Sequence, residues 1–283
     1  TLTYDIPTDK EGDNDFAVMT RVENGSSLTF VGEGNVVADG YIASANEGGV
    51  VNISEGTFTT TSCTLFQSNG GKINISGGVF QAAEYDGDHR YTLNFVDSKK
   101  QAGLIEVTGG RFYKYNPYES HSESPAMNFC RDGYFGIEDG DWYEVVSMAY
   151  VHNADEFTAV GKDASIKAMI FADDINFGTS SAFITTDKIV YGNGYNLIAG
   201  GVNTTTYGLR IEGDINVVLN DLKMVDCGGV NIQKGAKVVV NDAFIKVKYA
   251  ATATRHLFYI AYEGSELTIN SGEFEISTTS QKY

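Results

Sequence analysis

One short phrase recurs along this chain and limits what the chain can fold into. It reads GGKINISGGVF at residues 70–80, GGVVNISEGTF ending at Phe58, GLIEVTGGRF ending at Phe112 and GSELTINSGEF ending at Phe274. In each copy an aliphatic residue precedes the phenylalanine by five positions, as Ile75 precedes Phe80. Residues an odd number apart on a straight strand face opposite sides, so two core residues at this spacing need a turn between them. The glycines before each phenylalanine supply that turn.

Other segments keep the pattern less strictly. Asn-Asp replaces Ser-Gly at the turn between Leu219 and Met224 and between Val240 and Ile245, and both dipeptides tolerate unusual backbone angles. Two variants lengthen the offset to six residues, one from Phe30 to Val36 and one from Tyr191 to Leu197. The residues expected to begin each copy, called anchors below, are Phe30, Ile53, Ile75, Val107, Tyr191, Leu219, Val240 and Ile269.

The spacing of the anchors predicts the architecture. Phe30 and Ile53 are 23 residues apart, Ile53 and Ile75 are 22 apart, and Leu219 and Val240 are 21 apart. A period in the low twenties with strand-type patterning alone is typical of a solenoid in which each repeat is one turn of backbone. The consensus of leucine-rich repeats and the hexapeptides of left-handed β-helices are both missing from the sequence. We therefore expect an all-β fold, a right-handed parallel β-helix, whose hand follows the general preference for right-handed crossovers.

Charge restricts the partners of the chain. It has 37 acidic and 20 basic residues among 283, which gives a net charge of −17. This balance argues against nucleic acid or an anionic membrane as a partner and leaves a neutral sugar, a protein surface or bound cations. No apolar run approaches the roughly 18 residues that a membrane span needs. Because the chain starts at Thr1 and not at Met, the removal of a leader or of a whole N-terminal module stays open.

The repeats divide the chain into four predicted parts. Residues 1–25 form an acidic N-terminal approach, residues 26–112 a first β-helix, residues 113–160 a junction that breaks the period, and residues 161–283 a second β-helix. Within the junction, NADEFTAV predicts one short helix capped by Asn153, with Asp155 and Glu156 in its first turn. The step from Ile75 to Val107 is ten residues longer than one repeat, so we expect residues 82–100 to leave the first β-helix as a loop.

Three groups of residues are candidates for a site. The long loop carries a set that suits acid–base chemistry or the hydroxyls of a sugar, or equally an ordinary polar turn: Asp86, Asp88, His89, Arg90 and Tyr91. The junction carries aromatic residues that would either cap the open end of a coil or stack on a sugar: Tyr113, Tyr115, Tyr118 and Trp142. Acids alternate near the N-terminus as in a calcium loop, at Asp9, Glu11, Asp13 and Asp15, but Asn14 stands where that loop needs glycine. A solvated loop is therefore favoured there over a metal site.

The predicted outward row before the anchors argues against catalysis. Its residues are Thr29, Asn52, Asn74, Glu106, Val239 and Thr268, so it holds one acid where a glycosidase needs a pair. The four histidines, His89, His121, His152 and His256, lack metal-ligand spacing. Cys63, Cys130 and Cys227 are odd in number and far apart, which predicts buried thiols. We expect no enzyme and no cofactor, the alternative being a polysaccharide depolymerase that uses Asp86, Asp88 and His89.

The repeat phrase resembles that of right-handed parallel β-helix proteins, which include phage tailspikes, pectate-lyase-like enzymes and bacterial surface adhesins. The junction GGRFYKYNPYESHSESPAMNFCRDGYFGIEDGDWYEVV, with the NADEF helix after it, is similar to β-helix modules in virion proteins of phages that infect gut Bacteroides-type bacteria, including crAss-like phages. Cys130 and Arg131 depart from the small residues usual before the GY pair. The resemblance implies an outward-facing virion component, such as a head fibre, a capsid decoration or a tail-associated protein.

The same resemblance implies the partners. A homotrimer, other virion proteins and a host surface glycan are expected at the virion surface, with no nucleic acid and no membrane as partners. Two alternatives stay open: a tailspike enzyme that degrades polysaccharide, and an adhesin on a bacterial cell surface.

Overall fold

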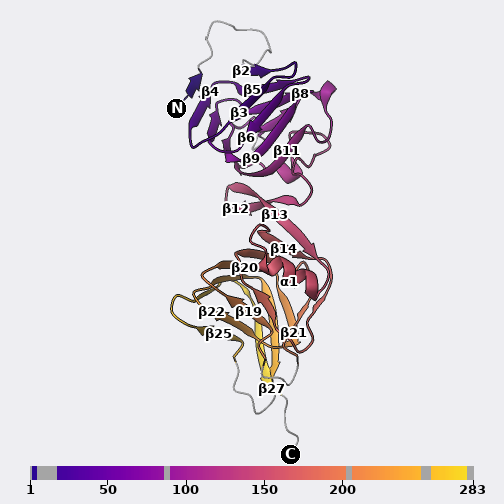
Figure 1. The fold of residues 1–283 in the computed structure, drawn as a ribbon, viewed down its shortest axis with the longest axis vertical. Coiled ribbons are helices and arrows are strands. Elements are labelled where there is room, and N and C mark those ends of the chain that lie inside the picture. Colours follow the sequence, from indigo (N-terminus) through magenta and orange to yellow (C-terminus); the bar gives the residue numbers. More distant parts are fainter. Residues whose placement is uncertain (1, 5–17, 86–89, 202–205, 250–255, 279–283) are drawn as a thin grey trace, which may run out of the picture. The chain divides into compact units, whose positions relative to one another are not determined.

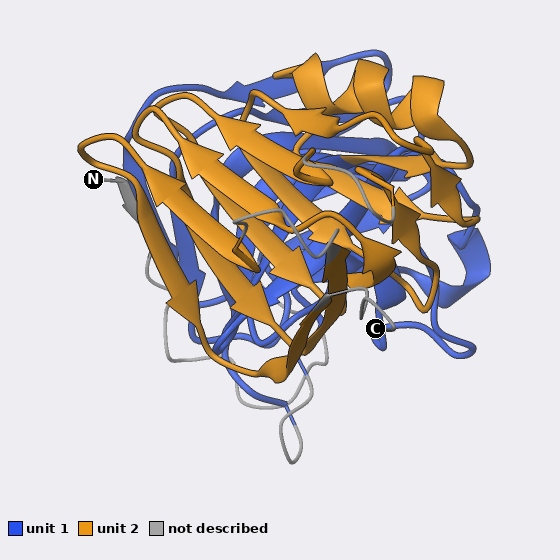
Figure 2. Ribbon diagram, turned by 90° about the horizontal axis from the view of Figure 1, so that it is seen from below, with its two compact units in different colours: residues 1–147 blue, residues 148–283 orange. Residues whose placement is uncertain are grey.

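The structure is a computed structural model, and it describes all residues except 1, 5–17, 86–89, 202–205, 250–255 and 279–283 (Figure 1). The chain divides into two compact units, unit 1 at Thr1–Ser147 and unit 2 at Met148–Tyr283, which are coloured separately in Figure 2. The division falls inside one long strand, β13 (Trp142–Val151), whose first half pairs within unit 1 and whose last four residues pair within unit 2.

Unit 1 consists of short strands and two 3₁₀ turns. Besides the first half of β13, its elements are β1 (Leu2–Tyr4), β2 (Val18–Val22), β3 (Ser27–Phe30), β4 (Asn35–Ala38), β5 (Tyr41–Asn46), β6 (Val50–Ile53), β7 (Thr57–Thr60), β8 (Phe66–Asn69), β9 (Lys72–Gln81), β10 (Leu93–Phe95), η1 (Asp97–Lys99), β11 (Ile105–Tyr113), η2 (Pro117–Glu119) and β12 (Tyr134–Asp139). Strands pair in parallel in the orders β3-β6-β9-β11, β1-β4-β7-β9 and β2-β5-β8-β10, whereas β13 is antiparallel to β11 and β12.

The strand register of unit 1 follows the predicted anchors. Ile53 lies in register with Phe30 on one side and with Ile75 on the other, and Ile75 lies in register with Val107, all in parallel. Five or six residues further on, the second core position forms a row of its own, made of Val36, Phe58, Phe80 and Phe112. In that row the Phe58 and Phe80 rings stack at 5.3 Å and the Phe80 and Phe112 rings at 4.6 Å. Stacked core rows of this kind explain why the same two residue types return in every repeat.

In the repeats that end at Phe80 and Phe112, two glycines make the corner between these rows, each for a separate reason. A Cβ on Gly77 or Gly109 would collide with the carbonyl oxygen of Ser54 or Ser76 on the preceding repeat, so only glycine lets the two backbones approach. Gly78 has a φ of +107°, which side-chain-bearing residues rarely adopt, and a Cβ there would lie 3.0 Å from the Phe80 ring.

The loop expected at residues 82–100 is shorter than predicted. Leu93 and Phe95 belong to β10, which pairs in parallel with β8, and both side chains are buried. The chain therefore rejoins the sheet after residue 92, because this Leu-x-Phe alternation supplies two further core side chains.

Unit 2 repeats the parallel arrangement, and Figure 2 shows its strands side by side and pointing the same way. Its elements are the end of β13, α1 (Ala154–Lys162), β14 (Ala168–Phe171), β15 (Ile175–Asn176), β16 (Ala182–Ile184), β17 (Lys188–Tyr191), β18 (Leu197–Ile198), β19 (Leu209–Glu212), β20 (Asn216–Asn220), β21 (Lys223–Cys227), β22 (Val230–Gln233), β23 (Lys237–Asn241), β24 (Ala243–Tyr249), β25 (Phe258–Ala261), β26 (Glu266–Ile269) and β27 (Gly272–Thr278). Parallel pairing runs in the orders β13-β14-β17-β20-β23-β26, β16-β19-β22-β25, β21-β24-β27 and β15-β18.

Two anchors of unit 2 differ from the prediction: Ile269, on the last strand of its row, is 45% exposed and not buried, and Tyr191 is displaced by one residue. Leu219, Val240 and Ile269 are in register as expected, but the partner of Leu219 on the preceding strand is Val190 and not Tyr191. Val190 is 1% exposed, whereas Tyr191 points outward and pairs with Asn220. The six-residue offset misplaced the anchor because aromatic residues fit either face of a strand.

Asparagines stack on successive strands of unit 2 at the corner position. Asn241 donates from Nδ2 to Oδ1 of Asn220 at 2.8 Å and accepts from Nδ2 of Asn270 at 2.8 Å. The aspartate after Asn220 also binds the turn, since the Asp221 carboxylate accepts from the backbone N–H groups of Gly192 and Asn193. The Asn220-Asp221 dipeptide thus satisfies backbone groups that this turn leaves unpaired.

The predicted helix is present as α1. Asn153 caps it by accepting from the backbone N–H of Glu156 at 2.9 Å, and the Glu156 carboxylate returns a contact to the N–H of His152. At the other end, the buried Lys188 ammonium donates to the carbonyl oxygen of Asp163 at 2.9 Å. The observed strands and this single helix among the described residues confirm an all-β fold built mostly of parallel strands.

The cysteines are free thiols in the described part of the chain. Cys130 and Cys227 are buried, and burial raises the pKa of each to about 12, whereas Cys63 is half-buried. Within the described residues, no helix combines the length and the apolar character needed to cross a membrane.

Candidate functional site

Several predicted site residues fall outside the described part of the chain. These are Asp86, Asp88 and His89 of the loop and Asp9, Glu11, Asp13 and Asp15 near the N-terminus. Of the described loop residues, Tyr91 packs against the Tyr85 ring with centroids 5.2 Å apart. Arg90 turns toward the junction, where its guanidinium carbon lies 5.2 Å from the centre of the Tyr113 ring.

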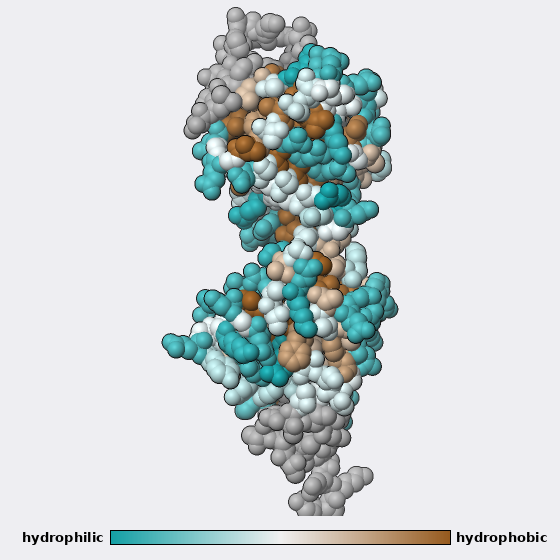
Figure 3. Space-filling model, in the orientation of Figure 1, coloured by the Kyte–Doolittle hydropathy of each residue, from teal (hydrophilic) through white to brown (hydrophobic). Residues whose placement is uncertain are grey.

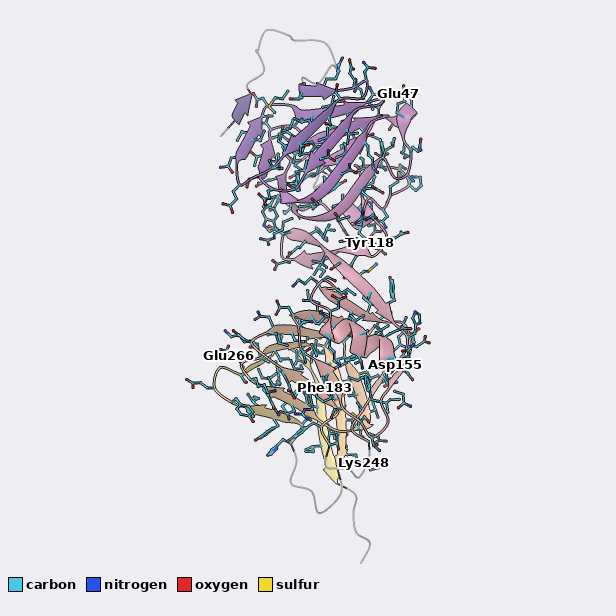
Figure 4. All side chains as sticks on the ribbon, in the orientation of Figure 1. Glu47, Tyr118, Asp155, Phe183, Lys248 and Glu266 are labelled. Carbon is cyan, nitrogen blue, oxygen red and sulfur yellow. The ribbon has the colours of Figure 1, made fainter. Side chains whose placement is uncertain are left out.

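The aromatic residues of the junction separate into two kinds. Tyr115 is 4% exposed, and its hydroxyl is 2.7 Å from that of Ser120 and donates to the carbonyl oxygen of Leu93 at 3.0 Å. Burial raises the pKa of Tyr115. Tyr115 therefore packs in the core, as in the capping alternative, and does not present its ring to a ligand. Tyr118, labelled in Figure 4, is exposed and contacts Phe135 edge-on at 6.3 Å.

Tyr113 and Trp142 instead lie together on the outside of unit 1. Their strands, β11 and β13, are antiparallel neighbours in which Tyr113 is opposite Trp142 and Arg111 is opposite Glu144. Because side chains alternate along a strand, the buried Phe112 sends Arg111 and Tyr113 to the outer surface together.

We call this group the arginine–aromatic face and define it as Arg90, Arg111, Tyr113, Lys114 and Trp142. The Arg111 guanidinium carbon is 5.3 Å from the centre of the Trp142 ring, and Lys114 Nζ is 5.8 Å from that of Tyr113. The Tyr113 and Trp142 rings meet edge-to-face at 5.2 Å. Cation–π contacts at exposed positions of this kind hold flat, rigid side chains in place with about 0.5–1 kcal/mol each.

Carboxylates complete the charge balance of the face. Asp139 pairs with the Arg111 guanidinium at 3.0 Å, and Asp141 lies 3.9 Å from the Lys114 ammonium. The Tyr113 hydroxyl also donates to Asp141 at 3.4 Å. Arg111 and Lys114 thus each have one nearby acid, and the face presents both donors and acceptors to a ligand.

Hollows on two sides border the arginine–aromatic face. A pocket of about 170 Å³ is lined by Arg90, Lys114, Tyr115, Asn116, Glu119, His121 and Tyr143. A more open groove of about 450 Å³ is lined by Glu33, Glu55, Gly56, Thr57, Gly77, Gly78, Val79, Gly110, Arg111 and Glu144. The corner glycines form part of its lining, since a position without Cβ leaves the space that a side chain would fill. The space-filling view shows polar and apolar residues interleaved on the visible surface of both units (Figure 3).

Sequence reasoning found part of this face and missed the rest. Arg90, Tyr113 and Trp142 were candidates, and the structure brings them together with Arg111 and Lys114. The signal that could have identified Arg111 is its place between the corner glycine Gly110 and the core residue Phe112, where every repeat puts an outward residue.

The outward row before the anchors forms as expected, and several of its polar side chains are paired. Thr29, Asn52, Asn74 and Glu106 are in register on successive strands, and Asn74 Nδ2 donates to Asn52 Oδ1 at 2.8 Å. Its one acid, Glu106, is paired with Lys72 at 2.8 Å. Among the residues whose placement is described, no three His, Cys, Asp or Glu side chains gather closely enough to hold a metal ion.

Comparison with known proteins gives one family model that matches part of the chain. Residues 148–272 match the model of the pectate lyase-like adhesive domain family. The matched stretch is 125 of 283 residues, counted from 148 to 272 inclusive, and it begins where unit 2 begins. No curated protein and no solved structure matches the chain. The family similarity supports the parallel β type and an adhesive, surface-binding role, and it brings no phage or virion protein with it.

Proposed function

We propose that this chain is a non-catalytic adhesive module that holds surface glycans on the arginine–aromatic face of unit 1. The observation that carries the proposal is the cluster in which the exposed Arg111 lies over the half-buried Trp142 ring, while Arg90, whose side chain is 8% exposed, supports the Tyr113 ring from below. Residues of this cluster also line a pocket and a groove. Trp, Tyr and Arg are the residue types most enriched at binding hot spots. The similarity of unit 2 to an adhesive-domain family supports the same class of function.

The scaffold of this module is proposed to be a right-handed parallel β-helix in each unit. Parallel pairing between segments one repeat apart supports it, as do contacts across the core of unit 1. There the Phe66 ring of β8 lies 5.5 Å from Phe58 of β7 and 6.1 Å from Phe80 of β9, so separate sheets face one core. A crystal structure tests the proposal, and left-handed crossovers or a flat open sheet would contradict it.

Binding can be measured on the full chain. Wild type should bind an immobilised mucin or capsular polysaccharide in biolayer interferometry, and Trp142→Ala should weaken binding at least tenfold, about 1.4 kcal/mol. Tyr150→Ala is the matched control, because Tyr150 is an aromatic residue of the same strand, 51% exposed, outside the face. Equal loss in both variants, or none in either, would overturn the assignment of the face.

The absence of catalysis is a separate part of the proposal. Pairing of Glu106 with Lys72 supports it, because the one acid of the outward row is already held in an ion pair and a second acid, which a glycosidase needs, is missing from that row. The same polysaccharides incubated with wild type should yield no reducing ends and no unsaturated uronate. Turnover that disappears in Asp88→Asn would instead establish a depolymerase that uses the loop.

The place of the module is proposed to be a virion surface, with a bacterial cell surface as the second candidate. The junction phrase supports a virion, whereas the adhesive-domain similarity suits either surface. Immunogold labelling with antibodies against the chain distinguishes them, since label on purified phage particles supports the first and label on cells alone supports the second.

A further inference from the structure

A second outward row, on the other unit, has the composition of a binding site. The parallel strands β16, β19, β22 and β25 bring Phe183, Arg210, Asn231 and Tyr259 into register on successive repeats. Phe183 is labelled in Figure 4. Their sequence neighbours on β16, β19 and β22 are buried core residues, so alternation directs these side chains to the outside of the sheet.

Three aromatic rings form one end of this row. Tyr259 is 40% exposed, and the rings of Tyr207 and His256 are nearly parallel to it, with centroids 5.6 Å and 5.4 Å away. The Tyr207 hydroxyl is 3.3 Å from Nδ1 of His256, which places these two rings side by side against Tyr259. Such a group offers flat apolar surface with polar edges.

Two polar atoms in the middle of the row have no hydrogen-bond partner among the residues that the structure describes. Asn231 is 4% exposed, yet its Oδ1 accepts no hydrogen bond from the described residues, and the Nε of its neighbour Arg210 donates none. Leaving a buried polar group unpaired costs about 1–3 kcal/mol, so such atoms call for a ligand or a water. The rest of the Arg210 side chain is held in place, 5.1 Å from the Phe183 ring and 2.7 Å from the Glu212 carboxylate.

The two free atoms specify the chemistry of the ligand. Asn231 Oδ1 needs a donor and Arg210 Nε needs an acceptor, and a hydroxyl group is both. A carboxylate could satisfy only Arg210 and would be repelled by Glu212, which is already shared between Arg210 and Lys234. We propose that this row binds a neutral pyranose, with one hydroxyl between Arg210 and Asn231 and the sugar face against the aromatic group.

Access requires a small movement. Both atoms are shielded from solvent, so a sugar hydroxyl reaches them only when a neighbouring side chain of the row, such as the 40% exposed Tyr259, turns aside. The inference rests on the adhesive function proposed above and adds a second site with a stated ligand class.

Calorimetric titration of the full chain tests this site. The probes are hexasaccharides of glucose, galactose and mannose, with hexagalacturonate as the acidic counterpart. We expect at least one neutral probe to bind, and Tyr259→Ala and Asn231→Leu each to weaken that binding tenfold or more. Tyr262→Ala is the control, because Tyr262 is 69% exposed and lies just beyond the same strand.

Asn231→Leu separates binding from folding. Leucine has a similar volume and no unpaired oxygen, so the unfolding midpoint should stay the same or rise while sugar binding falls. Unchanged affinity in both variants, binding of hexagalacturonate alone, or no binding of any neutral probe would overturn the site. If any of these results is obtained but the chain still binds mucin or capsular polysaccharide, only the second site is overturned and the proposed adhesive function stands. If wild type binds neither mucin nor capsular polysaccharide, the proposed adhesive function is overturned as well.

Discussion

Single residues of the core rows carry the stability of each repeat. Ile75 is 1% exposed and sits between Ile53 and Val107 on neighbouring strands, while Phe80 is stacked between Phe58 and Phe112. The Phe80 ring touches its equivalents in the repeat before and in the repeat after its own. A change at one position is therefore felt by three repeats.

Ile75→Asp should be among the most damaging single changes in unit 1. It places a carboxylate without a partner between aliphatic side chains, and unpaired buried charges destabilise by several kcal/mol. Urea denaturation measures the loss, with Gln81→Asp on the exposed side of the same strand as control. A midpoint close to wild type for Ile75→Asp would mean that this residue faces solvent.

Gly78→Ala tests the corner. The substitution meets both a φ of +107° and a ring atom of Phe80 at 3.0 Å, which together should cost about 1–3 kcal/mol. Gly103→Ala is the matched control, since Gly103 has a φ of +81° but nothing within 4 Å of the added carbon. The difference between the two unfolding free energies isolates the crowding, and equal losses would show that backbone angle alone matters.

Elements are joined by polar ladders as well as by apolar rows. Asn241 at the end of β23 is hydrogen-bonded to Asn220 at the end of β20 and to Asn270 just after β26. In addition, the Lys188 ammonium of β17 donates to the carbonyl oxygen of Asp163, the residue that follows α1. These contacts act between repeats, so they set how one strand follows the next. Like the apolar core rows, these hydrogen bonds join equivalent positions of successive repeats.

Asn241→Ala should loosen unit 2. It removes two amide hydrogen bonds of 2.8 Å, which at typical net values amounts to about 1–3 kcal/mol. Asn216→Ala, an exposed asparagine at the start of β20, is the control and should change the unfolding free energy little. A similar effect in both variants would show that the ladder contributes nothing specific.

Lys188 should make stability depend on pH in the alkaline range. Burial lowers the pKa of its ammonium from 10.5 to about 8, so between these values the unfolded chain binds more protons than the folded one. Stability contributed by this residue therefore rises as pH increases from 8 to 10.5. Lys188→Met lacks that titration, so the unfolding free energy of wild type minus that of the variant should increase across this window. A flat difference would contradict the lowered pKa.

The whole molecule is strongly acidic, and its assembly is open to a direct measurement. A net charge of −17 opposes association with polyanions such as nucleic acid through charge repulsion. Both units present several parallel strands whose edges need neighbours or covers. Association of several copies of the chain would cover these strand edges.

We propose a homotrimer as the assembly, because the sequence of the junction resembles β-helix virion modules and virion appendages of that fold are commonly trimeric. Multi-angle light scattering at micromolar concentration should then give three times the chain mass of 30.6 kDa. A mass of one chain would count against the trimer, and a mass of two would point to a different symmetry.

Local physical chemistry allowed the sequence alone to determine the repeat. Glycine at the corners and aliphatic or aromatic residues at fixed offsets limit the backbone to short strands and bends, so the all-β class, most anchors and helix α1 could be read directly. Tyr191 was misassigned and residues 93–95 were expected in a loop, because strand propensity does not say which face of a strand meets the core.

Tertiary structure alone decided which candidate residues form a site. Tyr115 and Tyr113 are two positions apart and chemically identical, yet one is buried beneath the junction and the other lies on the surface beside Trp142. Arg111 meets Trp142, and Tyr207 meets Tyr259, across 31 and 52 residues of chain. Contacts of this range depend on how repeats are stacked and where a strand turns back, and such long-range pairing leaves no mark in the local spacing of residues.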